Sequence, residues 1–122
     1  MPWGATIQEV VYRVIDAVPP DGKVLDLMCG PGYLLEQIHV LRPDISLTGI
    51  DLDSRYVAYA SARNKGIRYV QADVRDWNTD DRYDGVLCTG SVHHLPYSDQ
   101  PRLFTKLATL IKQGGFGICA EV

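Results

Sequence analysis

The sequence predicts a doubly wound α/β fold, with a mostly parallel sheet of about five strands flanked by helices. Two observations lead to it. Apolar runs of strand length alternate with helical patterns along the chain, as in βαβ units with right-handed crossovers. The runs are also nearly continuous in apolar residues, which is typical of strands covered on both faces. We therefore expect a ligand site outside the carboxyl ends of the strands.

The first expected helix covers residues 6–18. Thr6 and Glu9 have the spacing of a capping box, and apolar residues follow at helical spacing. Two prolines end this helix, and an apolar run that closes in Asp26 is the first strand. A glycine-rich turn follows, and then a helix over 34–41 that a proline stops.

The middle of the chain predicts a strand, a helix and another strand. Residues 45–51 are apolar and close in an acid. A helix is expected over 54–65, with Ser54 as its cap and Gly66 as its stop. Residues 67–71 form the third strand.

The last third begins with a polar loop over 75–82, and the fourth strand covers 84–89. Ser98 or Asp99 caps a final helix that begins with a proline in its first turn, and a Gly-Gly pair ends it. Residues 116–122 form the fifth strand. The residues expected on the buried face of the final helix are Leu103, Phe104, Leu107, Leu110 and Ile111.

Length and charge limit the classes of protein. The chain has 122 residues, which predicts a single domain over 1–122. Its net charge of −3 argues against a nucleic-acid surface, which usually shows clustered Lys and Arg. No apolar run approaches the roughly 18–20 residues of a membrane span. The three cysteines lack C-x-x-C spacing, so they predict neither a zinc site nor a disulfide framework, and a reducing cytoplasm is the simple expectation.

The turn after the first strand reads Asp26-Leu27-Met28-Cys29-Gly30-Pro31-Gly32. Such a junction brings backbone N–H groups and a helix N-terminus close to a ligand. It is not the dinucleotide fingerprint G-x-G-x-x-G, because Leu35 stands at the third glycine, and no phosphate-loop pattern occurs. A carboxylate at Asp26 would repel a pyrophosphate and would suit a ligand with hydrogen-bond donors or positive charge.

Three acids, Asp26, Asp51 and Asp73, close successive strands and should meet at one edge of the sheet. Three carboxylates in one crevice would be costly without a donor-rich ligand, to which they could make charge-assisted hydrogen bonds. For Asp53 and Asp76 we expect ordinary roles as helix caps or turn formers.

The turn from Asp26 to Gly32 resembles the first motif of the class I S-adenosylmethionine (SAM)-dependent methyltransferases, acid-x-Gly-x-Gly-x-Gly. Met28 stands at the first glycine of that pattern. Residues 49–53, 72–74, 83–89 and 110–115 resemble the family's later motifs, in the same order. The resemblance implies a Rossmann-like fold, SAM as methyl donor and S-adenosylhomocysteine (SAH) as product.

The resemblance also implies a role for each acid. Asp51 would hold the ribose hydroxyls, Asp73 would meet the adenine amine, and Asp26 would sit near the methionine end. The end of the fourth strand, at Thr89, would pass beside the sulfonium. The predicted cofactor-binding residues are Asp26, Met28, Gly30, Gly32, Asp51, Leu52, Asp73, Val74 and Thr89.

Two adjacent histidines, His93 and His94, follow the fourth strand. Histidine titrates near neutral pH and is the commonest general base. Adjacent side chains on a loop cannot easily point the same way, so at most one should face the methyl group. We predict catalytic positions here, with His94 either a base or a residue that lines the pocket, and no metal site, because no third ligand is near.

The acceptor is expected to be a small molecule with an O, N or C nucleophile. The chain is acidic and lacks the Asn-Pro-Pro-Tyr or Asp-Pro-Pro-Tyr of DNA adenine methylation and the Pro-Cys of cytosine methylation. Two alternatives stay open: a SAM-binding module or enzyme fragment without turnover, and a nicotinamide-dependent dehydrogenase.

The fifth strand is expected to be an edge of the sheet. The resembling family has two further strands after it, whereas this sequence stops at Val122. An open edge invites pairing with another chain. We expect either a fragment of a longer enzyme or a homodimer that pairs through this edge.

Overall fold

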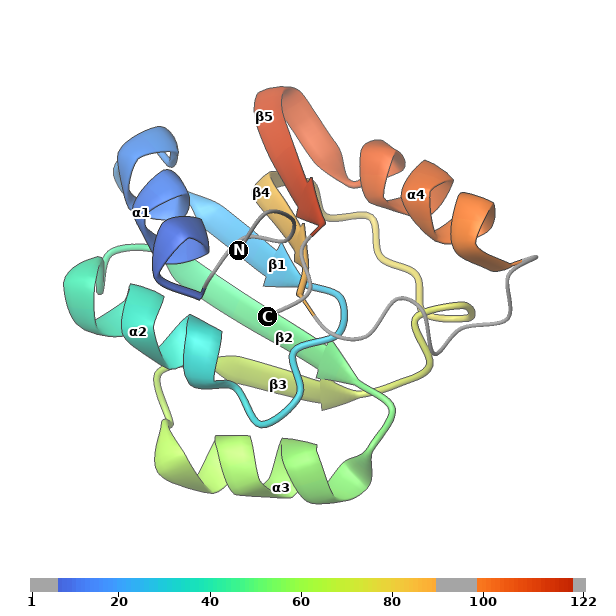
Figure 1. The fold of residues 1–122 in the computed structure, drawn as a ribbon, viewed down its shortest axis with the longest axis horizontal. Helices are drawn as coiled ribbons and strands as arrows, with labels where there is room; N and C mark the ends of the chain where they lie inside the picture. Colours follow the sequence, from blue (N-terminus) through green and yellow to red (C-terminus); the bar gives the residue numbers. More distant parts are fainter. Residues whose placement is uncertain (1–6, 90–98, 120–122) are drawn as a thin grey trace.

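Five parallel strands form one sheet in the order β3-β2-β1-β4-β5 (Figure 1). The structure is a computed structural model that describes residues 7–89 and 99–119. This arrangement confirms the predicted doubly wound α/β fold. The elements are α1 (Ile7–Ala17), β1 (Lys23–Asp26), α2 (Tyr33–Leu41), β2 (Ser46–Asp51), α3 (Ser54–Arg63), β3 (Arg68–Gln71), β4 (Tyr83–Cys88), α4 (Gln100–Thr109) and β5 (Ile111–Cys119).

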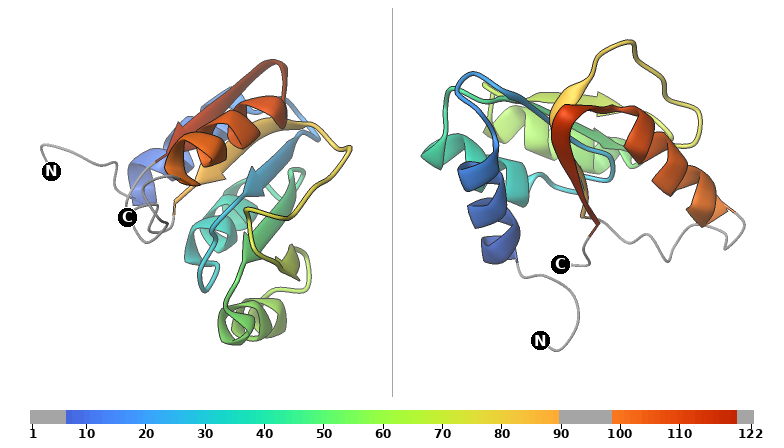
Figure 2. Two further views of the ribbon diagram at one scale, coloured as in Figure 1. Left: turned by 90° about the vertical axis from the view of Figure 1, so that its right-hand side faces the viewer. Right: turned by 90° about the horizontal axis from the view of Figure 1, so that it is seen from above.

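The sheet separates two apolar clusters. Figure 2 shows the sheet and its helices from two further directions. Helices α1 and α2 pack their apolar faces into one cluster, together with Val24 and Leu47 of the sheet. Helix α4 packs into the other cluster through Leu103 and Leu107, with Leu25 and Val86. Because β1 lies in the middle of the sheet, its last three side chains, Val24, Leu25 and Asp26, are fully buried. Among the described residues no helix is both long and apolar enough to cross a membrane.

Helix α3 lies beside β2 and β3. Its first residue is Ser54, and Asp53, the residue before it, is the cap. The side chain of Asp53 accepts the hydrogen bond of the Arg55 N–H at 2.9 Å. The prediction of Ser54 as the cap was therefore wrong, and the expected capping role of Asp53 is confirmed. The helix also ends earlier than predicted: Asn64 closes it, and its side chain accepts from the N–H of Gly66 at 2.9 Å.

Strand β5 begins at Ile111, five residues before the predicted start. The N–H of Tyr83 donates to the carbonyl of Leu110 at 2.8 Å, and Ile111 is the strand partner of Tyr83. The ladder then shifts register and resumes at Phe116. Gly114 takes a φ of +83° within this irregular stretch, where a side chain would be strained. The Gly-Gly pair therefore bends a strand and does not end a helix.

The buried face of α4 is narrower than predicted. Leu103 and Leu107 are buried, as is Leu110 at the end of the helix. Phe104, by contrast, is 46% exposed, because its neighbours Leu103 and Leu107 are the positions that face the sheet. Ile111 belongs to β5, where it is partly buried against the same cluster.

Candidate functional site

The carboxylate of Asp26 is fully buried at the carboxyl end of β1. The hydroxyl of Thr89, directly after β4, donates to Oδ2 of Asp26 at 2.6 Å, and the N–H of Met28 donates to Oδ1 at 3.3 Å. Burial raises the pKa of Asp26 to about 6, and the two hydrogen bonds offset part of that rise. Asp26 thus joins the ends of β1 and β4, while its predicted contact with a ligand stays a prediction.

The glycine-rich turn between β1 and α2 needs its two glycines for different reasons. Gly32 has a φ of +89°, and a Cβ there would lie 2.5 Å from the hydroxyl of Tyr69 and 3.1 Å from the Cβ of Ala60. Gly30 has a φ of +57°, but a Cβ there would meet no heavy atom of the described chain within 4 Å. Gly32 is therefore required by packing, whereas Gly30 leaves open space over the turn.

Asp51, the last residue of β2, holds this turn in place. Its Oδ2 accepts from the N–H of Gly30 at 2.8 Å, and its Oδ1 accepts from the N–H of Asp53 at 2.9 Å. Each carboxylate oxygen has a second lone pair, so Asp51 can still accept hydrogen bonds from a ligand. The next side chain, Leu52, is 60% exposed, and its carbonyl accepts from Nε2 of Gln71 at 3.1 Å. The end of β2 thus presents an acceptor and an apolar side chain together.

Asp73, in the turn after β3, is bound by Arg75. The Asp73 carboxylate accepts from the N–H of Arg75 at 2.9 Å and from its guanidinium at 2.7 Å. These hydrogen bonds lower the pKa of Asp73. The same guanidinium reaches Asp99, at the start of α4, at 3.3 Å. Hydrogen bonds to Asp73 and Asp99 raise the pKa of Arg75, which therefore stays charged and ties the turn to the helix.

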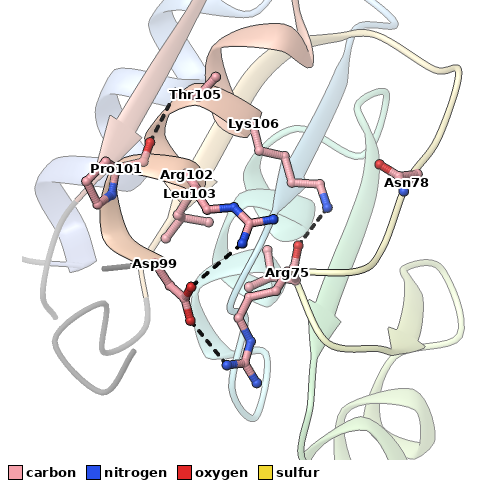
Figure 3. A pocket seen from close by; sticks show the side chains of 9 residues that line it. Arg75, Asn78, Asp99, Pro101, Arg102, Leu103, Thr105 and Lys106 are labelled. Atoms are coloured by element: carbon pink, nitrogen blue, oxygen red, sulfur yellow. Dashed lines mark hydrogen bonds and ion pairs between the residues drawn. The ribbon is translucent and has the colours of Figure 1, made fainter. Parts of the chain in front are cut away.

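A cavity of about 550 Å³ lies between α4 and the loop after β3 (Figure 3). The ammonium of Lys106 donates to the carbonyl of Val74 at 2.7 Å across it, and desolvation lowers the pKa of Lys106. The Arg75–Asp99 ion pair lies at one end of the cavity. Its lining is Val74, Arg75, Asn78, Asp99, Pro101, Arg102, Leu103, Thr105 and Lys106.

The predicted site residues that the structure describes all lie at the carboxyl ends of strands or directly after them. Hydrogen bonds connect those after β1 to those after β2 and β4, whereas Asp73 binds Arg75 instead of another predicted residue. His93 and His94 lie outside the described residues. Sequence reasoning missed Arg75 and Asp99. A basic residue two positions after Asp73 was the available signal for Arg75, whereas the contact with Asp99 depends on how α4 packs.

Comparison with known proteins places this geometry among methyltransferases. A family model described as a methyltransferase domain matches residues 24–115. Trans-aconitate 2-methyltransferase of Escherichia coli is 33% identical over 92 residues, which are 75% of this chain and 36% of that enzyme. The matched part of the chain thus spans just over a third of the length of the curated relatives that it matches.

Solved structures share the fold. DesVI of Streptomyces venezuelae aligns with a TM-score of 0.79 at 21% identity, over 95% of this chain and 49% of that one. SAM-bound CalS10, an amino pentose methyltransferase from Micromonospora echinaspora, aligns with a TM-score of 0.75 at 24% identity. The alignment covers 87% of this chain and 45% of CalS10. The sugar N-methyltransferase KedS8 from Streptoalloteichus aligns with a TM-score of 0.75 at 26% identity. The alignment covers 92% of this chain and 46% of KedS8.

Proposed function

Because the chain belongs to the SAM-dependent methyltransferase family, we propose that its strand-end site binds SAM and directs the methyl group to a small-molecule acceptor. The observation that carries this proposal is the pairing of Asp51 with the N–H of Gly30, beside an exposed Leu52 and open space over the turn. Such a site offers hydrogen-bond acceptors and an apolar surface at one edge and is suited to a nucleoside without phosphates.

The residues at this edge fit the parts of SAM. The Asp51 carboxylate has lone pairs left for the ribose hydroxyls, and the Leu52 side chain offers a surface for the adenine ring. The carboxylate of Asp73 is held by Arg75 and keeps acceptor capacity for the adenine amine. The open turn at Gly30 lets the methionine end approach the backbone.

Bound SAM supplies a methyl group on a positively charged sulfur, which is a good leaving group. The residues of this chain then orient the donor against the acceptor, and proximity accounts for most of the rate. The buried bond between Asp26 and Thr89 fixes the ends of β1 and β4, between which the reacting groups meet. No metal ion is needed for this step.

We retain His94 and His93 as candidate catalytic residues on the evidence of the sequence alone. A base is needed only for an acceptor whose nucleophile carries a proton that must leave, such as a hydroxyl. An amine that is protonated near neutral pH must likewise lose a proton before it attacks, whereas for a carboxylate acceptor a histidine would serve only to line the pocket.

The acceptor we propose is a small molecule with an O, N or C nucleophile. Its support is the relatives: one is named for trans-aconitate, and two solved structures for sugars. The net charge of −3 also fits a small-molecule enzyme better than a nucleic-acid one. We further propose a cytoplasmic location, since the described cysteines are all free thiols.

A homodimer through β5 is the assembly we propose. In the described part of the sheet β5 pairs with β4 on one side, and it forms the end of the strand order. Unpaired strand groups invite pairing with a second copy of the same edge. Light scattering tests this: a dimer is expected, and a monomer at tens of micromolar would contradict it.

The test of the activity is a methyl-transfer screen. The full chain is incubated with SAM and panels of small carboxylic acids, amino sugars and phenols, and SAH formation is followed by mass spectrometry. We expect acceptor-dependent SAH, and much less of it with Asp51→Asn. SAM binding with no turnover on any panel would favour the binding-module alternative, whereas no binding would contradict the whole proposal.

A further inference from the structure

Cys88 and Cys119 end neighbouring parallel strands and are direct register partners in the β4–β5 ladder. Adjacent strands lie about 4.8 Å apart, which falls within the Cα–Cα range of about 4.4–6.8 Å that disulfides span. The pair therefore satisfies the first geometric condition for a covalent link between the strands.

Both side chains also point to the same face of the sheet. Cys88 belongs to the apolar cluster beneath α4. Gly117 faces α4 as well, because a Cβ there would lie 2.5 Å from Cδ2 of Leu107. Side chains alternate along a strand, so Cys119, two residues on, shares that face. The two thiols accordingly influence the pKa of each other.

The two thiols differ in access and in acidity. Cys119 is exposed, whereas Cys88 is fully buried. The interaction between them lowers the pKa of Cys119 and, together with burial, raises the pKa of Cys88. The thiolate is the reactive form of cysteine. Cys119 is thus the nucleophile that an oxidant meets first, and Cys88 is the thiol positioned behind it.

We propose that Cys119 and Cys88 form a reversible disulfide between β5 and β4 when the protein meets a hydroperoxide. The Cys119 thiolate attacks the peroxide, breaks its O–O bond and becomes a sulfenic acid, with one water released after proton transfer. The Cys88 sulfur then attacks the Cys119 sulfur, and the sulfenic oxygen leaves as a second water. Two thiols lose two electrons and two protons, and one hydrogen peroxide becomes two waters.

The link would lie beside the candidate site and is independent of the proposed function. Cys88 directly precedes Thr89, whose hydroxyl holds the Asp26 carboxylate. A disulfide at Cys88 would fix the end of β5 to the strand that carries this bond. It would also close a loop in the unfolded chain and so stabilise the fold.

Cys29 supplies a matched internal control. It too is buried, but it packs in the opposite cluster, with α1 and α2, and its thiol lies 3.6 Å from the carbonyl of Gly30. Burial raises the pKa of Cys29, so it should be the thiol that survives mild oxidation.

The test treats the full chain with hydrogen peroxide near neutral pH, alkylates the remaining thiols and measures the intact mass and the peptide map. We expect a loss of two hydrogens, one alkylated cysteine at position 29, a cross-linked peptide that joins residues 88 and 119, and full reversal by dithiothreitol. The midpoint of thermal unfolding should rise by about 5 °C or more in the oxidised form.

Three variants separate the roles. Cys29→Ser should oxidise as the wild type does. Cys119→Ser should form no disulfide. Cys88→Ser should leave a sulfenic acid at Cys119, which dimedone traps. If Cys88→Ser does not fold, the wild type and Cys29→Ser still decide the question. Oxidation of Cys119 to a sulfinic acid, or only a disulfide between chains, would overturn the proposal.

Discussion

The hydroxyl of Thr89 and the carboxylate of Asp26 form a buried hydrogen bond of 2.6 Å between residues 63 positions apart in the chain. The bond joins the ends of β1 and β4, which are neighbours in the sheet. Burial raises the pKa of Asp26 to about 6, and the bond from Thr89 opposes that rise. The site is thus built on an acid that is only partly stabilised in its charged form.

Asp26 should make the stability of the fold depend on pH. Its pKa is about 6 in the folded chain and about 3.8 in the unfolded one, so between these values the folded state holds more protons. The free energy of unfolding should therefore fall as pH rises from about 4 to 6. The Asp26→Asn side chain is neutral at every pH. The free energy of unfolding of this variant should therefore rise relative to that of wild type, by on the order of 2–3 kcal/mol, as pH rises over that range.

Urea unfolding at pH values from about 4.5 to 8 measures this dependence. The matched control is Asp44→Asn, at a carboxylate whose pKa Arg42 lowers. The contribution of Asp44 is complete above its unfolded pKa, so the difference from wild type should stay flat over the same range. A flat difference for Asp26→Asn as well would contradict the assignment of the raised pKa.

Removal of the Thr89 hydroxyl should destabilise the fold most at high pH. Thr89→Val leaves Oδ2 of a buried carboxylate without its donor, which costs about 1–3 kcal/mol. Below about pH 5 the loss should shrink, because Asp26 is then protonated. Thr89→Ser keeps the hydroxyl and should behave as wild type. If thermal unfolding shows the same loss of stability for Thr89→Val and Thr89→Ser, the hydrogen bond does not contribute to the stability of the fold.

The two turn glycines should separate stability from binding. Gly32→Ala places a Cβ against Tyr69 at a φ of +89°, so it should lower the free energy of unfolding by about 2–4 kcal/mol. Gly30→Ala meets only the backbone cost of about 1–2 kcal/mol, but it fills the space over the turn. Gly30→Ala should therefore weaken the binding of SAH by about tenfold or more. Thermal unfolding and calorimetry with SAH should rank the two variants in opposite order, and the same order in both would refute the account.

Arg75 should act on binding more than on stability. Its ion pairs are partly exposed, so Arg75→Gln should cost less than about 1 kcal/mol of unfolding free energy. Release of Asp73 should nevertheless lower SAH affinity several-fold. Arg102→Gln is the control, since Arg102 is 80% exposed and lies 4.0 Å from Asp99. Equal SAH affinities for the two variants would rule out this role of Arg75.

Hydrophobic periodicity was enough to predict the order of the elements, and the acids at the strand ends were predicted to lie at one edge of the sheet, where the candidate site is proposed. Hydrophobic periodicity misplaced the start of β5, because the pairing of Ile111 with Tyr83 is a contact between distant parts of the chain. The choice between Asp53 and Ser54 as the cap of α3, and the contact of Arg75 with Asp99, likewise depend on backbone geometry that residue types alone do not specify. The burial of Asp26 could not be predicted either, since it follows from the central place of β1 in the sheet.

Calorimetry with SAH tests the central claim most directly. The wild-type chain should bind SAH with a micromolar dissociation constant and should not bind NADH. Asp51→Asn should lose about 2–3 kcal/mol of SAH binding, whereas Asp53→Asn, which alters the neighbouring cap of α3, should bind as wild type does. Binding of NADH in preference to SAH, or an unchanged affinity in a folded Asp51→Asn variant, would contradict the account.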